Sequence, residues 1–402
     1  MSSALVYAPD SAPTGAPNGA SVADLQQRGF VPLAQSGYWA APEALRDEAQ
    51  FLTALQALQE NASPLEFAED WLAAHKQELI TAANARIDAV ELDEQLNAVF
   101  GMLERRQVLS TITGPPGAAK STVASLWAKT ARMAYPTLPL VVITQERPAL
   151  QRLCDKINAD DAAEFTVDEA LSPETDWPEN AAIIIDEAGL FGTSVMAQLL
   201  QRSANAKAAK IILIGDDRQL GSNHAGQPFR WLCQQDRCDS IVLSHPFRQK
   251  NPELRTAVQH LYQGRIGEAL ALIPCHFPAQ AALAKKIRAL LDHTTPEKTM
   301  IVVHGPLYLH ERLRNCCAGF RIFPLATAQG LAVDGVILVL AQKTDSAELL
   351  VGCSRQRFTL DVVADQDVYK DRAAIAQNIG DFPKDLMALD VVGADVVLGL
   401  VG

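Results

Sequence analysis

A glycine-containing loop between an apolar run and a helical run limits the choice of fold more than any other segment. Residues 108–113 (V-L-S-T-I-T) are apolar and β-branched, while in residues 122–129 (T-V-A-S-L-W-A-K) apolar side chains recur three and four apart. Between them lies G-P-P-G-A-A-K-S, residues 114–121. A strand, a tight loop and a helix in this order form a phosphate-binding loop. The segment therefore predicts a parallel sheet with helices on its faces.

Each residue type in this loop suits a nucleoside triphosphate and magnesium. Gly114 and Gly117 let backbone N–H groups turn toward phosphate oxygens, and the following helix directs its positive end at the same place. Lys120 is positioned for the β- and γ-phosphates, and Ser121 offers a hydroxyl to Mg²⁺. Thr122 completes the expected contacts with ATP. The alternative is a glycine-rich turn without a ligand.

Ala119 departs from the usual pattern, in which a glycine precedes the lysine. Glycine adopts positive φ angles without steric cost, whereas a Cβ crowds the backbone there. We expect strain in the loop, and nucleotide binding with slow turnover.

Two adjacent carboxylates follow a second apolar run. Residues 181–185 (A-A-I-I-I) precede Asp186 and Glu187, and Asp186 lies 66 residues after Lys120. At the end of a buried strand, Asp186 would hold Mg²⁺ through water, and Glu187 would orient and deprotonate the attacking water. Taken alone, such a pair is more often a solvated surface pair.

Similar apolar runs of four to six residues continue along the chain and predict buried parallel strands. They alternate with helical patterns, and a second group follows residue 246, so the expected fold is α/β with two doubly wound parallel-sheet domains and a small N-terminal helical domain. The additional runs are L-P-L-V-V-I-T, K-I-I-L-I-G-D, T-M-I-V-V-H and G-V-I-L-V-L.

The expected domain boundaries follow composition. Residues 1–21, rich in Pro, Gly, Ala and Ser, predict a flexible tail, and residues 22–89 an acidic helical domain. We expect residues 90–245 to form the first α/β domain, which contains the phosphate-binding loop, residues 246–370 to form the second, and residues 371–402 to form a C-terminal extension.

Net charge is unevenly distributed. Residues 1–100 carry 14 acidic and 4 basic side chains, whereas the rest carry 33 and 31, within a total net charge of −12. A protein partner for the acidic N-terminal region is one interpretation, and plain structural packing is the other. The nearly neutral remainder leaves room for a local basic groove.

The seven cysteines lack C-x-x-C spacing, so we expect reduced thiols and neither disulfides nor a zinc site. No run of eighteen apolar residues and no secretory signal are present, which predicts a cytoplasmic protein without membrane contact.

A third strand followed by Gly215-Asp216-Asp217-Arg218-Gln219-Leu220 makes the order of motifs similar to that of superfamily 1B helicases. The resemblance is to the helicases of conjugative relaxases and of the exonuclease V alpha subunit, and it extends from Leu92 to Leu360. It implies that residues 90–245 and 246–370 are two RecA-like P-loop NTPase domains. It also implies an ATPase whose nucleotide lies between them and whose partner is nucleic acid, most simply single-stranded DNA.

The resemblance also assigns roles to single residues. Gln95 would contact the adenine, Gln219 would sense the γ-phosphate, and Gln329 would belong to the nucleotide site. Arg248 in S-H-P-F-R-Q and Arg355 in V-G-C-S-R-Q-R would contact the γ-phosphate from the second domain, with Arg355 as an arginine finger. As single residues, they would ordinarily be surface groups.

Two nucleic-acid motifs depart from the family. The usual A-P-T-G is absent after residues 141–144, and the family's threonine, histidine and lysine are replaced by Pro324, Ala326 and Thr327. Two hypotheses therefore remain: a DNA translocase or helicase, and a nucleotide-dependent switch or scaffold that acts through a protein partner. A small-molecule kinase fits less well, because it needs no arginines from a second domain.

Overall fold

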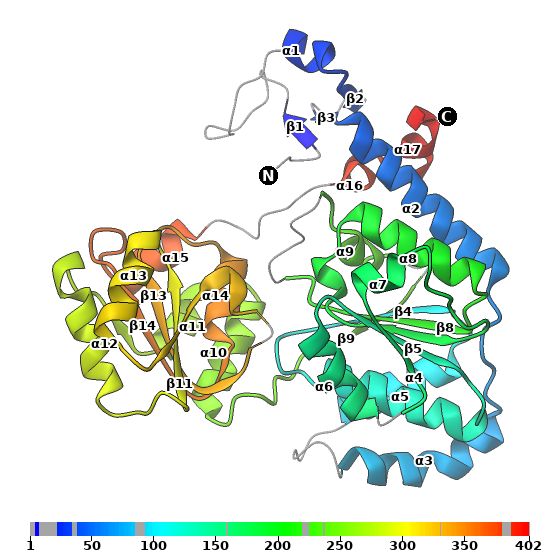
Figure 1. The fold of residues 1–402 in the computed structure, drawn as a ribbon, viewed down its shortest axis with the longest axis horizontal. Coiled ribbons are helices and arrows are strands. Elements are labelled where there is room, and N and C mark those ends of the chain that lie inside the picture. Colours follow the sequence, from blue (N-terminus) through cyan, green and yellow to red (C-terminus); the bar gives the residue numbers. More distant parts are fainter. Residues whose placement is uncertain are drawn as a thin grey trace.

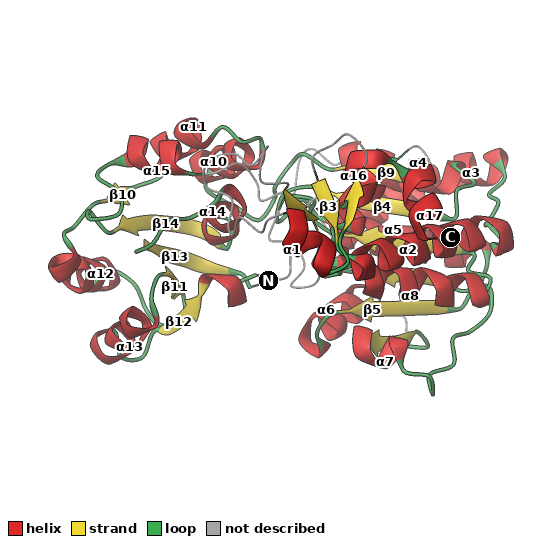
Figure 2. Cartoon of the chain, turned by 90° about the horizontal axis from the view of Figure 1, so that it is seen from above, coloured by secondary structure: helices red, strands yellow, loops and turns green. Residues whose placement is uncertain are grey.

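The computed structural model describes residues 5–7, 22–33, 38–84, 93–157, 160–218, 225–235, 238–329, 331–379 and 387–401. Two parallel sheets, each covered by helices on both faces, lie side by side (Figure 1). Figure 2 shows the two sheets in separate halves of the molecule, each with helices on both of its sides. The expected α/β class with two helix-covered parallel sheets is confirmed.

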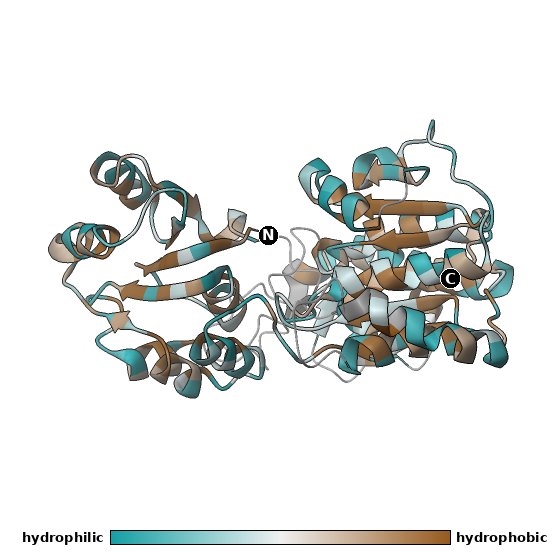
Figure 3. Cartoon of the chain, turned by 90° about the horizontal axis from the view of Figure 1, so that it is seen from below, coloured by the Kyte–Doolittle hydropathy of each residue, from teal (hydrophilic) through white to brown (hydrophobic). Residues whose placement is uncertain are grey.

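The first sheet has six parallel strands in the order β6-β5-β7-β8-β4-β9. Its central strands are completely buried, as expected for parallel strands covered on both faces. They appear largely in hydrophobic brown in Figure 3. The strands are β4 (Leu109–Thr113), β5 (Leu140–Thr144), β6 (Ala163–Thr166), β7 (Ala182–Ile185), β8 (Lys210–Ile214) and β9 (Asp239–Val242).

Successive strand residues point to opposite faces, so this sheet supports two cores. One face is covered by α3 (Glu69–Asn84), α4 (Asp93–Glu104), α5 (Lys120–Ala134) and α6 (Arg147–Ile157). The other is covered by α2 (Pro42–Asn61), α7 (Val167–Leu171), η1 (Ala188–Leu190), α8 (Thr193–Asn205) and α9 (Pro228–Leu232).

The second sheet has five parallel strands in the order β10-β14-β13-β11-β12. Its strands are β10 (Cys275–His276), β11 (Thr299–His304), β12 (Arg321–Pro324), β13 (Val333–Leu340) and β14 (Gln356–Ala364). One face packs α10 (Pro252–Tyr262), α11 (Ile266–Ala271), η3 (Leu325–Thr327), α14 (Ser346–Cys353) and α15 (Arg372–Asn378). The other packs α12 (Leu283–Leu291), which η2 (Gln280–Ala282) precedes, and α13 (Leu307–Cys316).

The described parts of residues 22–89 differ from the separate helical domain that we expected. Leu45, Phe51 and Leu55 of α2 are buried in the same core as strand residues of the first sheet, and α3 packs on α4 and α5 across the opposite face. The apolar face of α2 therefore packs against α8 and not against α3. The smaller elements are β1 (Leu5–Tyr7), α1 (Val22–Gln27), β2 (Val31–Leu33) and β3 (Tyr38–Ala40), with the three strands in one antiparallel sheet.

The expected C-terminal extension also joins this first core. Helices α16 (Ala388–Val392) and α17 (Ala394–Val401) lie against α2 (Figure 1). Leu389 and Val397 are buried, and the backbone N–H of Leu389 donates to the buried carboxylate of Glu48 over 2.8 Å. None of the helices in the described ranges is long and apolar enough to cross a membrane.

Candidate functional site

The loop between β4 and α5 depends on its glycines for two separate reasons. Gly114 and Gly117 have φ angles of +148° and +88°. A Cβ on Gly114 would lie 2.2 Å from the carbonyl oxygen of Leu243, and one on Gly117 would lie 2.5 Å from Cβ of Arg248. The loop is therefore shaped for close approach of the segment that leads into the second domain.

Ala119 occupies the left-handed region, with φ 66° and ψ 24°, directly before the first residue of α5. A residue with a Cβ is destabilised in this region by about 1–2 kcal/mol relative to right-handed backbone. The strain expected from the sequence is thus present in the backbone.

Replacing Ala119 with glycine is expected to relieve this strain. The gain is partly offset by the greater freedom of glycine in the unfolded chain, about 0.5–1 kcal/mol, so the free energy of unfolding should rise by up to about 1.5 kcal/mol. We also expect faster ATP turnover, measured by phosphate release at saturating ATP. Ala118→Gly is the control, because Ala118 has no positive φ; turnover that is unchanged or lower in Ala119→Gly would show that the alanine does not slow the site.

Lys120 begins α5 and directs its ammonium group back into the loop. Its Nζ donates to the carbonyl oxygens of Gly114 at 2.6 Å and Pro115 at 3.1 Å. Burial lowers the pKa of Lys120, while the carboxylates of Asp216 and Glu187 oppose that shift. A desolvated cation among backbone dipoles favours an anionic ligand.

Ser121 and Asp186 meet across the loop. The Ser121 hydroxyl donates to Oδ2 of Asp186 over 3.1 Å, which joins the first turn of α5 to the carboxyl end of β7. A hydroxyl beside a carboxylate is the oxygen donor set that Mg²⁺ takes from proteins when phosphate and water supply its other ligands. These two residues therefore fit the expected metal. Thr122 follows in the same turn, and its backbone N–H donates to the carbonyl of Ala119 over 2.9 Å.

Glu187 is held in an uncommon backbone conformation beside Asp186. Its φ is 54° and ψ 34°, and its backbone N–H donates to Oδ1 of Asp186 over 2.8 Å. Burial and then repulsion by Asp186 raise the pKa of Glu187, whereas Lys120 and Arg355 act in the opposite direction. A carboxyl group with a raised pKa at a strand end is suited to take up a proton.

Two arginines reach this site from the other side. Arg355 follows α14 and is 2% exposed, and Arg248 lies in the segment between the two sheets, where its Nη1 donates to the carbonyl of Ser354 over 3.1 Å. Burial, followed by repulsion from Arg248, lowers the pKa of Arg355 to about 9, and attraction to Glu187 and Asp216 opposes this. Burial also lowers the pKa of Arg248.

Lys120, Asp186, Glu187, Arg248 and Arg355 therefore form one charge cluster. Arg248 repels both Lys120 and Arg355, and burial desolvates all three cations, so a phosphoryl group between them would stabilise the arrangement.

The structure says less about the three glutamines that were predicted to contact the nucleotide. Gln95 on α4 is completely buried, its Nε2 lies 3.4 Å from Oε2 of Glu94, and its Oε1 has no hydrogen-bond partner among the described residues. Gln329 is half-buried in the turn after η3, and Gln219 lies outside the described residues. The roles of all three in nucleotide binding stay predictions.

A contact between the two domains went unpredicted. Oδ1 of Asp217, after β8, accepts from the Thr113 hydroxyl at 2.6 Å and from the Tyr262 hydroxyl of α10 at 3.1 Å. The guanidinium of Arg218 lies 4.9 Å from the centre of the Tyr262 ring. Asp216 and Asp217 follow a buried strand as Asp186 and Glu187 do, and this repetition was the available signal.

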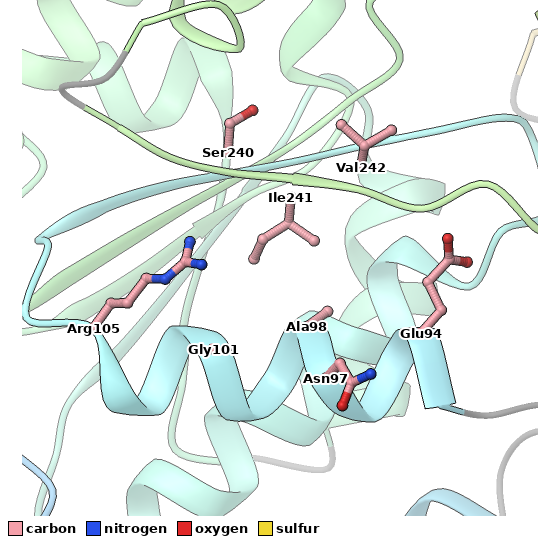
Figure 4. Close-up of a pocket in the computed structure, with 8 residues that line it drawn as sticks. All are labelled: Glu94, Asn97, Ala98, Gly101, Arg105, Ser240, Ile241 and Val242. Carbon is pink, nitrogen blue, oxygen red and sulfur yellow. The ribbon is translucent and has the colours of Figure 1, made fainter.

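A separate open cavity of about 490 Å³ lies between α4 and the edge strand β9. Figure 4 shows Ile241 pointing toward α4, with Glu94 and Arg105 near the two ends of that helix. Glu94 accepts from the backbone N–H of Ser244 at 2.7 Å and from its hydroxyl at 2.8 Å. The carboxylate thereby holds the segment between the domains against α4.

Comparison with known proteins agrees with these motifs. Residues 92–276 match the family described as an AAA domain. The chain is 30% identical to the conjugal transfer protein TraA of Agrobacterium fabrum (strain C58) over 128 residues. This match covers 30% of this chain and 11% of TraA. It is 31% identical to the multifunctional conjugation protein TraI of Escherichia coli over 127 residues, a match that covers 31% of this chain and 7% of TraI. The matches thus span about a tenth of each curated relative.

Among solved structures, the Pif1 helicase from Bacteroides in complex with ADP-AlF3 and ssDNA is similar, with 11% identity, coverage of 73% of this chain and 95% of that one, and a TM-score of 0.48. The matches to TraA, TraI and the AAA domain confirm the resemblance to a superfamily 1 helicase core of the conjugative relaxase type. The matched segment, residues 92–276, includes the phosphate-binding loop, the Asp186-Glu187 pair and Arg248.

Proposed function

We propose that this chain is an ATP-hydrolysing superfamily 1 motor that acts on DNA and binds ATP between its two α/β domains. The observation that carries the proposal is the charge cluster, to which the first domain supplies Lys120, Asp186 and Glu187 and the segments beyond it supply Arg248 and Arg355. A site assembled from two domains changes when they separate, so nucleotide turnover would be coupled to domain movement.

The roles follow from position. Lys120 would contact the β- and γ-phosphates, and Ser121 and Asp186 would hold Mg²⁺. The metal supplies neutralisation of phosphate charge when it is bound. Glu187 would orient a water molecule and accept its proton as the oxygen attacks the γ-phosphorus and ADP leaves. The two guanidinium groups would stabilise the charge on the transferring group.

The resemblance to superfamily 1 helicases makes single-stranded DNA the expected track. The chain has a net charge of −12, so binding requires a local basic surface instead of overall attraction. A soluble cytoplasmic setting remains part of the proposal.

The test is ATP hydrolysis by the purified chain with and without single-stranded DNA. A motor should hydrolyse ATP several-fold faster with the strand, because nucleotide and strand sites are coupled. Slow hydrolysis that does not change when single-stranded DNA is added would instead favour the nucleotide-dependent switch or scaffold. In that case a protein partner of the acidic N-terminal region would be expected.

A further inference from the structure

Gln249 directly follows Arg248, and its buried side chain reaches the segment that carries Arg355. It is completely buried, and its Nε2 donates to the carbonyl oxygens of Ser354 at 3.2 Å and Gln356 at 3.3 Å. These two carbonyls flank Arg355 in the sequence. One amide group therefore holds the backbone on both sides of that arginine.

The main chain of Gln249 is fixed as well. Arg255 of α10 donates from Nε and Nη2 to the carbonyl oxygen of Gln249, at 3.2 and 3.0 Å. The next residue, Lys250, donates its backbone N–H to the carbonyl of Arg357 over 2.7 Å. Because both the side chain and the main chain are held, the position of Gln249 is set by the second domain.

Arg248 contacts the same carbonyl group. It directly precedes Gln249, and its Nη1 donates to the Ser354 carbonyl that Gln249 also contacts. The guanidinium of Arg355 is oriented by its own turn, with Nε donating to Val351 O at 2.9 Å and Nη2 to the Ser354 hydroxyl at 2.8 Å. Two desolvated cations repel each other, so they stay adjacent only where neutral groups hold them.

We propose that Gln249 is a positioning residue that sets Arg355 relative to Arg248, so that both guanidinium groups reach the γ-phosphate together. This inference rests on the proposed function, because it assigns the arginines to ATP hydrolysis. Gln249 itself would not touch the nucleotide; it acts through the carbonyls of Ser354 and Gln356. A misplacement of about 1 Å in such a group can slow a reaction about 10²-fold.

The test is steady-state ATP hydrolysis by Gln249→Leu, with Gln356→Leu as the matched control. Gln356 is equally buried and neighbouring, but its side-chain polar atoms have no hydrogen-bond partner among the described residues. We expect kcat of Gln249→Leu to fall about 10- to 100-fold while KM stays within a few-fold. Gln356→Leu should change kcat by less than about twofold, because it removes no positioning bond. Where Gln249→Leu does not fold, Gln249→Met, which keeps an unbranched side chain, replaces it.

A double-mutant cycle with Arg355→Ala separates positioning from general damage. In the Arg355→Ala background, Gln249→Leu should change kcat by less than a further threefold or so, because the group that it positions is gone. An equal loss in Gln356→Leu, or a full additional loss in the double variant, would overturn the inference. If Arg355→Ala itself leaves kcat unchanged, the proposed role of Arg355 fails first, and the positioning role falls with it.

Discussion

Arg355→Ala is expected to lower kcat for ATP hydrolysis by about 10³-fold or more, with nucleotide affinity nearly unchanged. The guanidinium is buried and is attracted electrostatically by Glu187 and Asp216, so charge that develops on a transferring phosphoryl group at this site would be stabilised. An interaction that forms chiefly in the transition state changes rate without changing ground-state binding. Phosphate release and the binding of a fluorescent ATP analogue measure the two quantities separately.

Arg357→Ala is the matched control for this variant. Arg357 lies two residues further along, on β14, and its side chain is 52% exposed and paired with Asp334 at 3.4 Å. An exposed ion pair of this kind contributes little, so we expect kcat within about twofold of the unmodified chain. If affinity fell as much as rate in Arg355→Ala, Arg355 would be a binding residue and the arginine-finger role would be wrong.

Glu187→Gln is expected to abolish nearly all ATP hydrolysis. In the residual activity of this variant, the rise of kcat with pH should be absent. In the unmodified chain kcat should rise with pH as Glu187 loses its proton, because only the carboxylate can accept a proton from water. Burial and the neighbouring Asp186 raise the pKa of Glu187, so this rise should lie above the usual range for glutamate. A pH–rate profile at saturating ATP measures it.

The sign for stability is the reverse. A raised pKa means that the folded state favours the neutral carboxyl group, so this group's contribution to stability is present at low pH and is lost as pH rises through the raised value. Glu187→Gln should therefore fold at least as stably as the unmodified chain at neutral pH. Glu146→Gln, at an exposed position after β5, is the control and should retain both activity and pH profile. A retained acid limb in Glu187→Gln would assign the proton to another group.

Strands β4, β5, β7, β8, β11 and β13 could be predicted from sequence because parallel strands buried on both faces are continuous apolar runs. The edge strands β6 and β12 could not, because the residues of β6 are only half-buried and Arg321 and Pro324 at the ends of β12 are exposed. Strand β14 lies inside its sheet, but its amino half is exposed at Arg357, Phe358 and Thr359, so it forms no such run either. In β9, polar residues at an edge gave no clear pattern.

Residues near the loop were predictable because their spacing along the chain follows from local structure. The strain at Ala119, for example, depends only on its position before α5. By contrast, the contact of Tyr262 with Asp217 and the anchoring of Ser354 by Gln249 join residues that are 45 and 105 positions apart. Contacts at such separations depend on how the second sheet is placed, which local patterns do not specify.

The same reasoning explains the N-terminal helices. An amphipathic pattern shows that α2 has one apolar face but does not identify the surface that covers it. In the structure that surface is α8 and the first sheet, with α16 and α17 on the same side.

The measurement that tests the proposed motor most directly is the rate of ATP hydrolysis as single-stranded DNA is added, at low and at moderate salt. The Lys120→Ala variant is the inactive control. We expect strong stimulation that weakens as salt rises, because phosphate contacts release counterions, and no hydrolysis in Lys120→Ala. Tight ATP binding with a slow rate that neither DNA nor salt changes would contradict coupling between the nucleotide site and a DNA track.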